Sequence, residues 1–365
     1  MSVSTLIRRT SIQLRIPVLT RRTFVVPALF VVLAITMVFC MGVGAVSINP
    51  SAIGQIILYQ MGMTGIENLP DHHISVVTSI RMPRILLGAI VGACLGVSGA
   101  VLQSLFRNPL AEPALVGVSS GCSLGAVATI FFGGFITQML GETSLIILTP
   151  LSAFLGGIIV TVLVYLLATR ESQTDMSIML LAGIAMNALA GAGVGMFIFM
   201  SDDQQVREIL FWMFGSLGGA MWRTLLPTLP IMIIGLGIVL FFGYSLNLYL
   251  LGEKEAKHLG INVQVLKWLL IAMVTMIVGA TVSLSGIIGF VGLVVPHLLR
   301  LSFGPDNRLL LPASALLGGI LLLLADLLAR TIVAPTELPI GLVTSLLGSP
   351  FFLYLLIRQK RVIRF

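Results

Sequence analysis

The chain contains about ten apolar runs, each long enough to cross a lipid bilayer as a helix. They lie near 24–46, 82–106, 114–135, 144–168, 177–200, 225–247, 264–285, 287–301, 309–329 and 340–357. A transmembrane helix needs about 20 predominantly apolar residues to cross a hydrocarbon core of roughly 30 Å. Only 10% of the 365 residues are charged, whereas soluble domains carry about 25%. The sequence therefore predicts an all-α, polytopic membrane protein with about ten transmembrane helices.

The basic residues predict the orientation of these spans. With both termini on one side, sixteen of the 21 Lys and Arg residues fall on that side. They include the two clusters Arg8, Arg9, Arg15, Arg21, Arg22 and Arg358, Lys360, Arg361, Arg364. Cytoplasmic loops are enriched in Lys and Arg, so we expect both termini to be cytoplasmic. Because the net charge of +7 is explained by span ends, nucleic-acid binding is disfavoured.

The pattern predicts one membrane domain with two short tails. We assign 1–23 and 358–365 as basic cytoplasmic tails and 24–357 as a single ten-span domain. Within that domain, 47–80 is predicted as an external loop and 248–263 as a cytoplasmic loop. The segment Glu208–Arg223 is predicted to form a short helix outside the membrane. Span eight, near 287–301, is short and glycine-rich, so we expect a tilted or broken helix.

Several classes of chemistry have no sequence support. The chain has no GxxxxGK[ST] motif and hence no nucleotide-binding P-loop, and neither HExxH nor GxSxG occurs. Asp326 is the main candidate for a carboxylate inside the membrane, where a proton- or sodium-coupled carrier usually places ionisable residues. We therefore predict no catalytic residue, no metal site and no permanently bound cofactor, with energy supplied by a separate protein.

Two sets of small residues are predicted to pack helices together. One set consists of cysteines without a CxxC spacing, Cys40, Cys94 and Cys122. The other recurs every four residues in span two, Gly88, Gly92 and Gly96. Small residues let membrane helices approach closely, so we interpret both sets as structural.

The cytoplasmic loop after span six has the pattern of a short amphipathic helix. Glu253 and Lys257 are spaced as an i,i+4 ion pair. Ala256 and Leu259 would form a small apolar face, and Gly260 would end the helix. Such a helix is either an ordinary structured loop or a coupling helix that docks on a cytoplasmic ATPase.

Several sequence blocks, in order from residue 81 to residue 351, resemble one known family. They are Arg81-Met-Pro-Arg84, Ser98-Gly-Ala-Val-Leu-Gln103, Arg107-Asn-Pro-Leu-Ala-Glu-Pro113, Gly117-Val-Ser-Ser-Gly121, Gly289-Phe-Val-Gly-Leu-Val-Val-Pro-His-Leu-Leu-Arg300, Ala325-Asp-Leu-Leu-Ala-Arg330, Glu337-Leu-Pro-Ile-Gly341 and Gly348-Ser-Pro-Phe351. Together with the coupling loop they resemble the FecCD-type permeases of bacterial ABC importers for iron–siderophores, haem and cobalamin.

This resemblance implies a type II ABC importer permease in the bacterial inner membrane. It implies a homodimer, two ATP-binding subunits that use the ATP, and a periplasmic substrate-binding protein. The positions implied to contact the ATPase are Gly252, Glu253, Ala256, Leu259 and Gly260. Arg81, Arg84 and Arg330 are implied to receive acidic residues from the binding protein, because a guanidinium pairs bidentately with a carboxylate. The alternative for each arginine is a headgroup anchor.

Five residues are predicted to belong to a gate or pathway. Pro109 forces Asn108 out of the helical conformation, which gives either a plain turn or a cytoplasmic gate. Gln103 lies one turn before the end of span two and either lines the inner mouth or hydrogen-bonds a neighbouring helix. Pro296 and His297 lie within span eight, where we favour structural hydrogen bonding of the imidazole over haem ligation.

The cargo is predicted less sharply than the class of transporter. Glu112, within Asn-Pro-Leu-Ala-Glu-Pro, looks most like the haem-importing branch, whereas ferric siderophore and cobalamin remain alternatives. His72 and His73 in the outer loop are candidates for a transient contact with haem iron. A secondary carrier and a non-transporting membrane scaffold are the other two classes considered. The missing mid-membrane charges disfavour the first, and the coupling loop with its external arginines disfavours the second.

Overall fold

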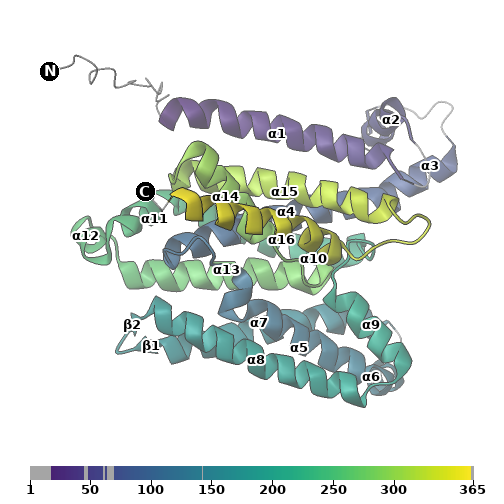
Figure 1. The fold of residues 1–365 in the computed structure, drawn as a ribbon. Coiled ribbons are helices and arrows are strands. Elements are labelled where there is room, and N and C mark those ends of the chain that lie inside the picture. The colour runs from purple at the N-terminus through teal and green to yellow at the C-terminus, as the bar shows by residue number, and fades with distance from the viewer. Residues whose placement is uncertain (1–17, 45–47, 61, 64–69, 142, 363–365) are drawn as a thin grey trace.

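The computed structural model describes residues 18–44, 48–60, 62–63, 70–141 and 143–362. Most of the predicted tail 1–23, the last three residues of the tail 358–365 and part of the predicted loop 47–80 lie outside the described residues. Figure 1 shows a bundle of roughly parallel helices with one short two-stranded hairpin.

The elements follow one another along the chain with short connections. The first half comprises α1 (Val18–Gly42), α2 (Pro50–Gln60), α3 (Asp71–Ser75), the π-helix η1 (Val76–Arg81), α4 (Met82–Leu105), the 3₁₀-helix η2 (Pro113–Val116), α5 (Val118–Phe131), α6 (Gly133–Leu140), α7 (Ser144–Ala168), β1 (Thr169–Arg170) and β2 (Gln173–Thr174). The second half comprises α8 (Met176–Met200), α9 (Asp203–Met213), α10 (Trp222–Phe241), α11 (Gly243–Leu251), α12 (Glu253–His258), α13 (Val263–Ser285), α14 (Val291–Phe303), α15 (Asn307–Thr331) and α16 (Ile340–Val362).

The prediction of an all-α polytopic membrane protein is confirmed. Seven helices in the described chain are long and apolar enough to span a membrane, and the pair α5–α6, bent by 64°, makes a further candidate. The two remaining predicted runs coincide with α14 and with the apolar part of α16, which are shorter. α14 has only 13 residues and follows irregular backbone at 286–290, as expected for a broken span eight.

The bundle has two ends that carry different elements (Figure 1). The start of α1, the end of α16, α12 and the β1–β2 hairpin lie at one end, which we call the α12 end. α2, α3 and α9 lie at the opposite end, which we call the α3 end. The predicted surface helix within Glu208–Arg223 is present in part, because α9 ends at Met213 and α10 begins at Trp222.

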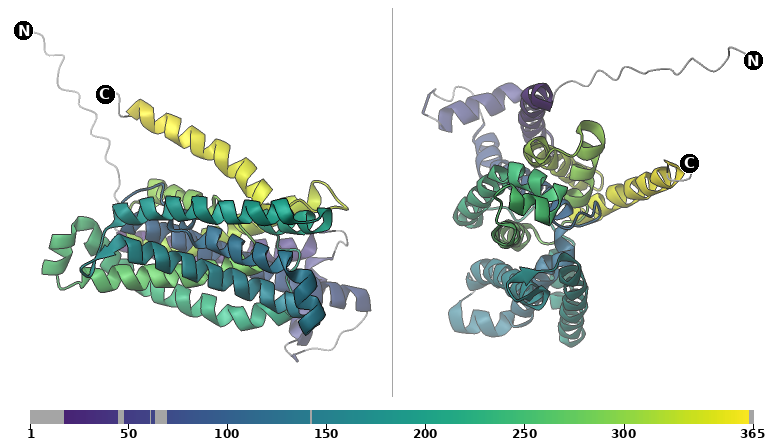
Figure 2. Two further views of the ribbon diagram at one scale, coloured as in Figure 1. Left: turned by 90° about the horizontal axis from the view of Figure 1, so that it is seen from below. Right: turned by 90° about the vertical axis from the view of Figure 1, so that its left-hand side faces the viewer.

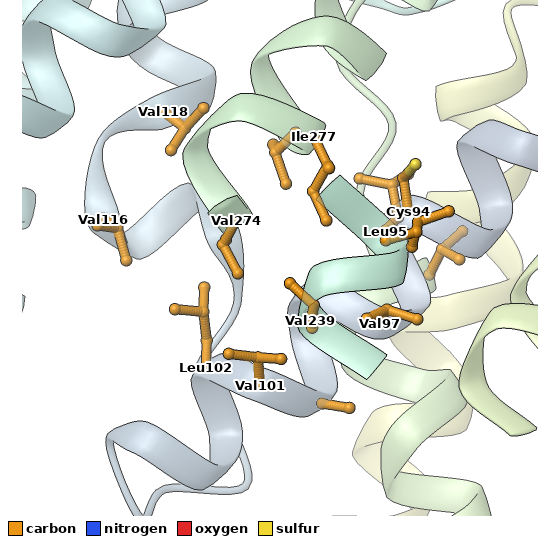
Figure 3. Close-up of a cluster of buried hydrophobic side chains, with 14 of the residues drawn as sticks. Cys94, Leu95, Val97, Val101, Leu102, Val116, Val118, Val239, Val274 and Ile277 are labelled. Atoms are coloured by element: carbon orange, nitrogen blue, oxygen red, sulfur yellow. The ribbon is translucent and has the colours of Figure 1, made fainter. Parts of the chain in front are cut away.

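Helix α4 lies in the centre of the bundle and packs against α10, α13, α14 and α15. Figure 3 shows its apolar side chains meeting Val239 of α10 and Val274 and Ile277 of α13. A Cβ atom built on Gly92 would lie 2.2 Å from the Gly318 oxygen of α15, and one on Gly96 would lie 2.4 Å from the Ser314 oxygen. The predicted packing role of these glycines is therefore confirmed.

The helices form two groups, which Figure 2 separates in its end-on view. α5, α7 and α8 pack on one another, and α13 contacts both α7 and the group around α4. The β1–β2 hairpin joins α7 to α8. In Figure 2 the helix α16 runs outward from the rest of the bundle.

The segment predicted as an external loop contains more helix than expected. Its described part holds α2, α3 and η1, and α3, η1 and α4 run on as one helix over Asp71–Leu105. Span two therefore begins eleven residues earlier than the apolar run at 82–106. The residues from Asp71 to Arg81 are more polar than the apolar run that follows, and they nevertheless form a helical extension of α4.

Candidate functional site

The short helix predicted in the loop after span six is present as α12, but its apolar residues do not share one face. Ala256 is fully buried against the bundle, whereas Leu259 is 56% exposed. Gly260 adopts φ +86°, and the Ile261 N–H donates to the Ala256 oxygen over 3.0 Å. The glycine therefore ends the helix as predicted, and the predicted shared apolar face of Ala256 and Leu259 is wrong.

The charge pairing of α12 also differs from the prediction. Glu253 forms an ion pair with Lys267 of α13, with 2.7 Å between Oε1 and Nζ. No Glu253–Lys257 ion pair occurs among the residues that the structure describes. A pair on one exposed helix is worth only about 0.3–0.5 kcal/mol, and Glu253 instead binds a cation that is almost completely buried.

Tyr249 ties α12 to the end of the central helix. Its hydroxyl lies 3.1 Å from the Leu105 oxygen and 3.3 Å from Glu253 Oε1. Arg107 stacks on the ring at 4.8 Å from the centroid and donates to the Tyr249 carbonyl over 2.8 Å. Burial, together with the Glu253 carboxylate, raises the pKa of Tyr249 above its ordinary value, so the phenol stays protonated and donates.

The three arginines predicted to face outward, Arg81, Arg84 and Arg330, lie together near the α3 end, in a buried charge cluster. Arg84 bonds both Asp326 oxygens through Nε at 3.1 Å, and its terminal nitrogens bond the Glu337 oxygens at 2.8 and 2.9 Å. Arg330 Nε lies 3.8 Å from Asp326. Arg81 is 5% exposed and donates to the carbonyls of Met41 and Gly42.

This geometry changes how the arginines could act in docking. The side chains of Arg84 and Arg330 are only 10% and 8% exposed, because Arg84 lies between Asp326 of α15 and Glu337, and Arg330 reaches the Cys40 carbonyl at the end of α1. Glu337, in the loop after α15, is 44% exposed and is the accessible part of the cluster. The guanidinium of Arg84 lowers the pKa of Glu337, so this carboxylate is ionised at neutral pH.

The predicted gate residues form a turn and a contact between helices. Asn108 begins a tight turn in which its Oδ1 accepts from the Leu110 N–H over 2.9 Å. Gln103 is 1% exposed and donates to the Leu293 oxygen of α14 over 3.3 Å. The alternatives of a plain turn at Asn108-Pro109 and of a hydrogen bond to a neighbouring helix for Gln103 match the structure.

The histidines differ in their surroundings. His297 follows Pro296 in α14 and is 6% exposed, and neither ring nitrogen has a hydrogen-bond partner in the described part of the chain. The predicted structural hydrogen bond of His297 is therefore not present. His72 and His73 lie on α3, with ring centroids 4.5 Å apart in an edge-to-face arrangement.

Three residues that contribute to the charge cluster at the α3 end or to the contacts of α12 were not predicted from the sequence. Glu337 and Tyr249 carried no signal beyond lying in or beside family-like blocks, and Lys267 was counted only as a cytoplasmic charge. A lysine four residues inside a predicted apolar helix was the one available signal, because charged residues within such segments almost always face a partner.

Comparison with known proteins places the chain in a family. The model of the FecCD transport family matches residues 32–358. The hemin transport system permease protein HmuU of Yersinia pestis is 47% identical over 286 residues, which cover 77% of this chain and 83% of that protein. The cobalamin import system permease protein BtuC of Halobacterium salinarum is 43% identical over 294 residues, covering 80% and 76%.

A solved structure has the same fold. It is described as an inward-facing conformation of a metal-chelate type ABC transporter and is 33% identical to this chain. It superposes with a TM-score of 0.77 and covers 92% of this chain and 99% of its own. Since the family model matches almost the whole membrane domain, the chain belongs to the FecCD transport family and is a permease subunit of an ABC importer of the metal-chelate type.

Proposed function

We propose that this permease forms the pathway for haem across the bacterial inner membrane. The observation that carries the proposal is the 47% identity to a hemin permease. The haem-like Glu112 block and the exposed His72 near the α3 end support it further. As in the sequence-based hypothesis, His72 and His73 serve as optional handover contacts, because a carrier that bound its cargo tightly would retain it.

The test is ATP-driven uptake by the complete complex in proteoliposomes. Permease, ATPase subunits and substrate-binding protein will take up haem on addition of ATP, and His72→Ala with His73→Ala will slow uptake by less than about tenfold, the effect of roughly 1.4 kcal/mol. Uptake of a ferric siderophore or cobalamin without uptake of haem would refute the haem assignment. Cobalamin is the second candidate, because the archaeal cobalamin permease is 43% identical.

The assembly follows from the same proposal. The α12 end faces the cytoplasm, so that α12 contacts one of two ATPase subunits and both chain ends are cytoplasmic. A second copy completes the permease, and the outward-running α16 and the exposed apolar face of α8 (for example Leu181, 67% exposed, and Leu189, 65%) are the surfaces available to it.

At the α3 end, we propose that a substrate-binding protein docks over the charge cluster. Since Arg84 is already paired, an acidic side chain of the partner reaches it by replacing Glu337, the exposed carboxylate. Arg81 and Arg330 support the cluster from its buried side. In this proposal the three arginines serve docking, and Glu337 competes with the acidic side chain of the binding protein for Arg84.

Glu337→Gln is therefore expected to strengthen docking. Removing the competitor will tighten the Kd of the binding protein for the reconstituted complex by about tenfold, or roughly 1.4 kcal/mol. The matched control is Glu208→Gln, which removes the same charge from an exposed position of α9 at the same end. Equal effects of both substitutions in a binding titration would mean that only net charge matters.

A further inference from the structure

We propose that Lys267 is a positioning residue that ties the coupling helix α12 to the β1–β2 hairpin and thereby to the start of α8. The inference rests on the proposed function of α12 as the ATPase contact. It adds a route by which a displacement of α12 reaches the other helix group of the permease.

Lys267 bonds two elements at once from a buried position. It lies in the second turn of α13 and is 1% exposed. Its Nζ is 2.7 Å from Glu253 Oε1 of α12 and 2.9 Å from the Thr174 oxygen of β2. An ammonium group carries three donors, so the two bonds coexist. In the described part of the chain, Lys267 is the side chain that bonds both α12 and the hairpin.

The hairpin is held to α13 through both backbone polar groups of one residue, Thr174. The Thr174 N–H donates to Gln264 Oε1 over 3.1 Å, and the Thr174 oxygen accepts from Lys267. Gln264 and Lys267 are three residues apart and therefore lie on the same face of α13. Because both groups of Thr174 are bound, a shift of this face of α13 moves the hairpin with it.

The hairpin passes that shift directly to α8. Asp175 follows Thr174 and caps α8, accepting from the Ser177 N–H over 2.7 Å. The Asp175 N–H donates back to the Ala168 oxygen at the end of α7 over 3.0 Å. The first turn of α8 is thus fixed relative to the residue that Lys267 holds, with no free linker between them.

The space around these bonds is a cavity with a mixed polar and apolar lining. Its volume is about 510 Å³, and its polar lining includes Glu253, Lys267, Arg170, Thr174 and Asp175. Packed side chains and rigid elements transmit displacements through contact, and here that contact is replaced by ionic and hydrogen bonds. The geometry therefore assigns the transmission to Lys267 rather than to hydrophobic contact between α12 and the hairpin.

The experiment uses the complete complex in proteoliposomes and measures substrate uptake per ATP hydrolysed. Lys267→Met, which leaves the partly exposed Glu253 to water, will lower this ratio by about tenfold, while ATPase assembly changes by less than about twofold. Gln264→Leu, which breaks one of the two bonds from α13 to Thr174 and leaves both Lys267 bonds in place, will lower it by about threefold. Lys267→Arg keeps a cation with several donors and will retain at least about half of the wild-type ratio.

The control is Arg308→Met at the same end of the bundle. It removes the 2.8 Å ion pair with Asp306, which lies within the start of one helix, and is expected to leave the ratio unchanged. A wild-type ratio in Lys267→Met would overturn the inference, and so would parallel losses of uptake and assembly, which indicate a merely structural role. If the wild-type complex itself fails to assemble or to transport, the proposed function fails first and the inference with it.

Discussion

Replacing Gly99 with alanine will strongly destabilise the folded permease. A Cβ atom at this position would lie 1.7 Å from the Gly292 oxygen and 2.8 Å from the Gly292 Cα. Both obstacles are backbone atoms of the neighbouring helix α14, so no side-chain rotation relieves the clash, and α4 must move away from α14. We expect a loss of about 3 kcal/mol or more in the free energy of unfolding, at the upper end of overpacking substitutions.

The measurement is the yield of monodisperse protein in detergent and its thermal unfolding midpoint. Gly237→Ala is the matched control, because Gly237 is an exposed glycine within α10 and a Cβ atom there would meet nothing within 4 Å. It should be neutral or stabilising, since alanine favours a helix over glycine by about 1 kcal/mol. Equal stability of Gly99→Ala and Gly237→Ala would show that the α4–α14 contact is looser than described.

Replacing Arg84 with methionine will produce the second large loss of stability. Arg84 is the principal partner of Asp326, which is 2% exposed and, among the residues that the structure describes, has Arg330 at 3.8 Å as its other cationic partner. Removing one partner of a buried ion pair leaves an uncompensated charge and costs about 3–5 kcal/mol. Arg84→Met with Asp326→Leu should recover much of this loss, because replacing a whole buried pair by apolar residues is often neutral.

The controls separate burial from charge. Arg207→Met removes an exposed arginine of α9 and should leave the unfolding midpoint unchanged. The pH dependence supplies a second check through Glu337, whose pKa Arg84 lowers from 4.5. Because the folded-state pKa is the lower one, the contribution of Glu337 to stability is present above about pH 4.5 and lost as the pH falls through the lowered pKa. A wild-type midpoint for Arg84→Met at pH 7 would contradict the role of the cluster.

The sequence was sufficient for the membrane spans and for the position of α12. Most apolar runs coincide with one helix, apart from 114–135, which is divided between α5 and α6, and 287–301, which begins in irregular backbone. Burial in lipid requires every backbone group to bond within its own helix, a local requirement that sequence patterns express well. Gly260 ended α12 as predicted for the same reason, since its left-handed conformation is also local.

Contacts between distant residues could not be predicted in this way. The bonds from Arg84 to Asp326 and Glu337 join residues 242 and 253 positions apart. A basic residue at the end of an apolar run is equally compatible with a headgroup, a partner protein or an internal carboxylate. The pairing of Glu253 with Lys267 instead of Lys257 is the same problem at shorter range, because burial of Lys267 decides it.

The length of the helix through Asp71–Leu105 fixes the depth of the charge cluster in the membrane. Its 35 residues extend about 52 Å at 1.5 Å per residue, whereas the hydrocarbon layer is about 30 Å thick. Counting about 20 residues back from Leu105, the outer edge of the hydrocarbon falls near Ile85, one residue from Arg84. With Leu105 placed at one edge of the hydrocarbon layer, the guanidinium and its carboxylates come level with the opposite edge while enclosed by protein. His72 stands about 18 Å further along the same helix, so α3 projects well beyond that edge and stands clear of the acyl chains.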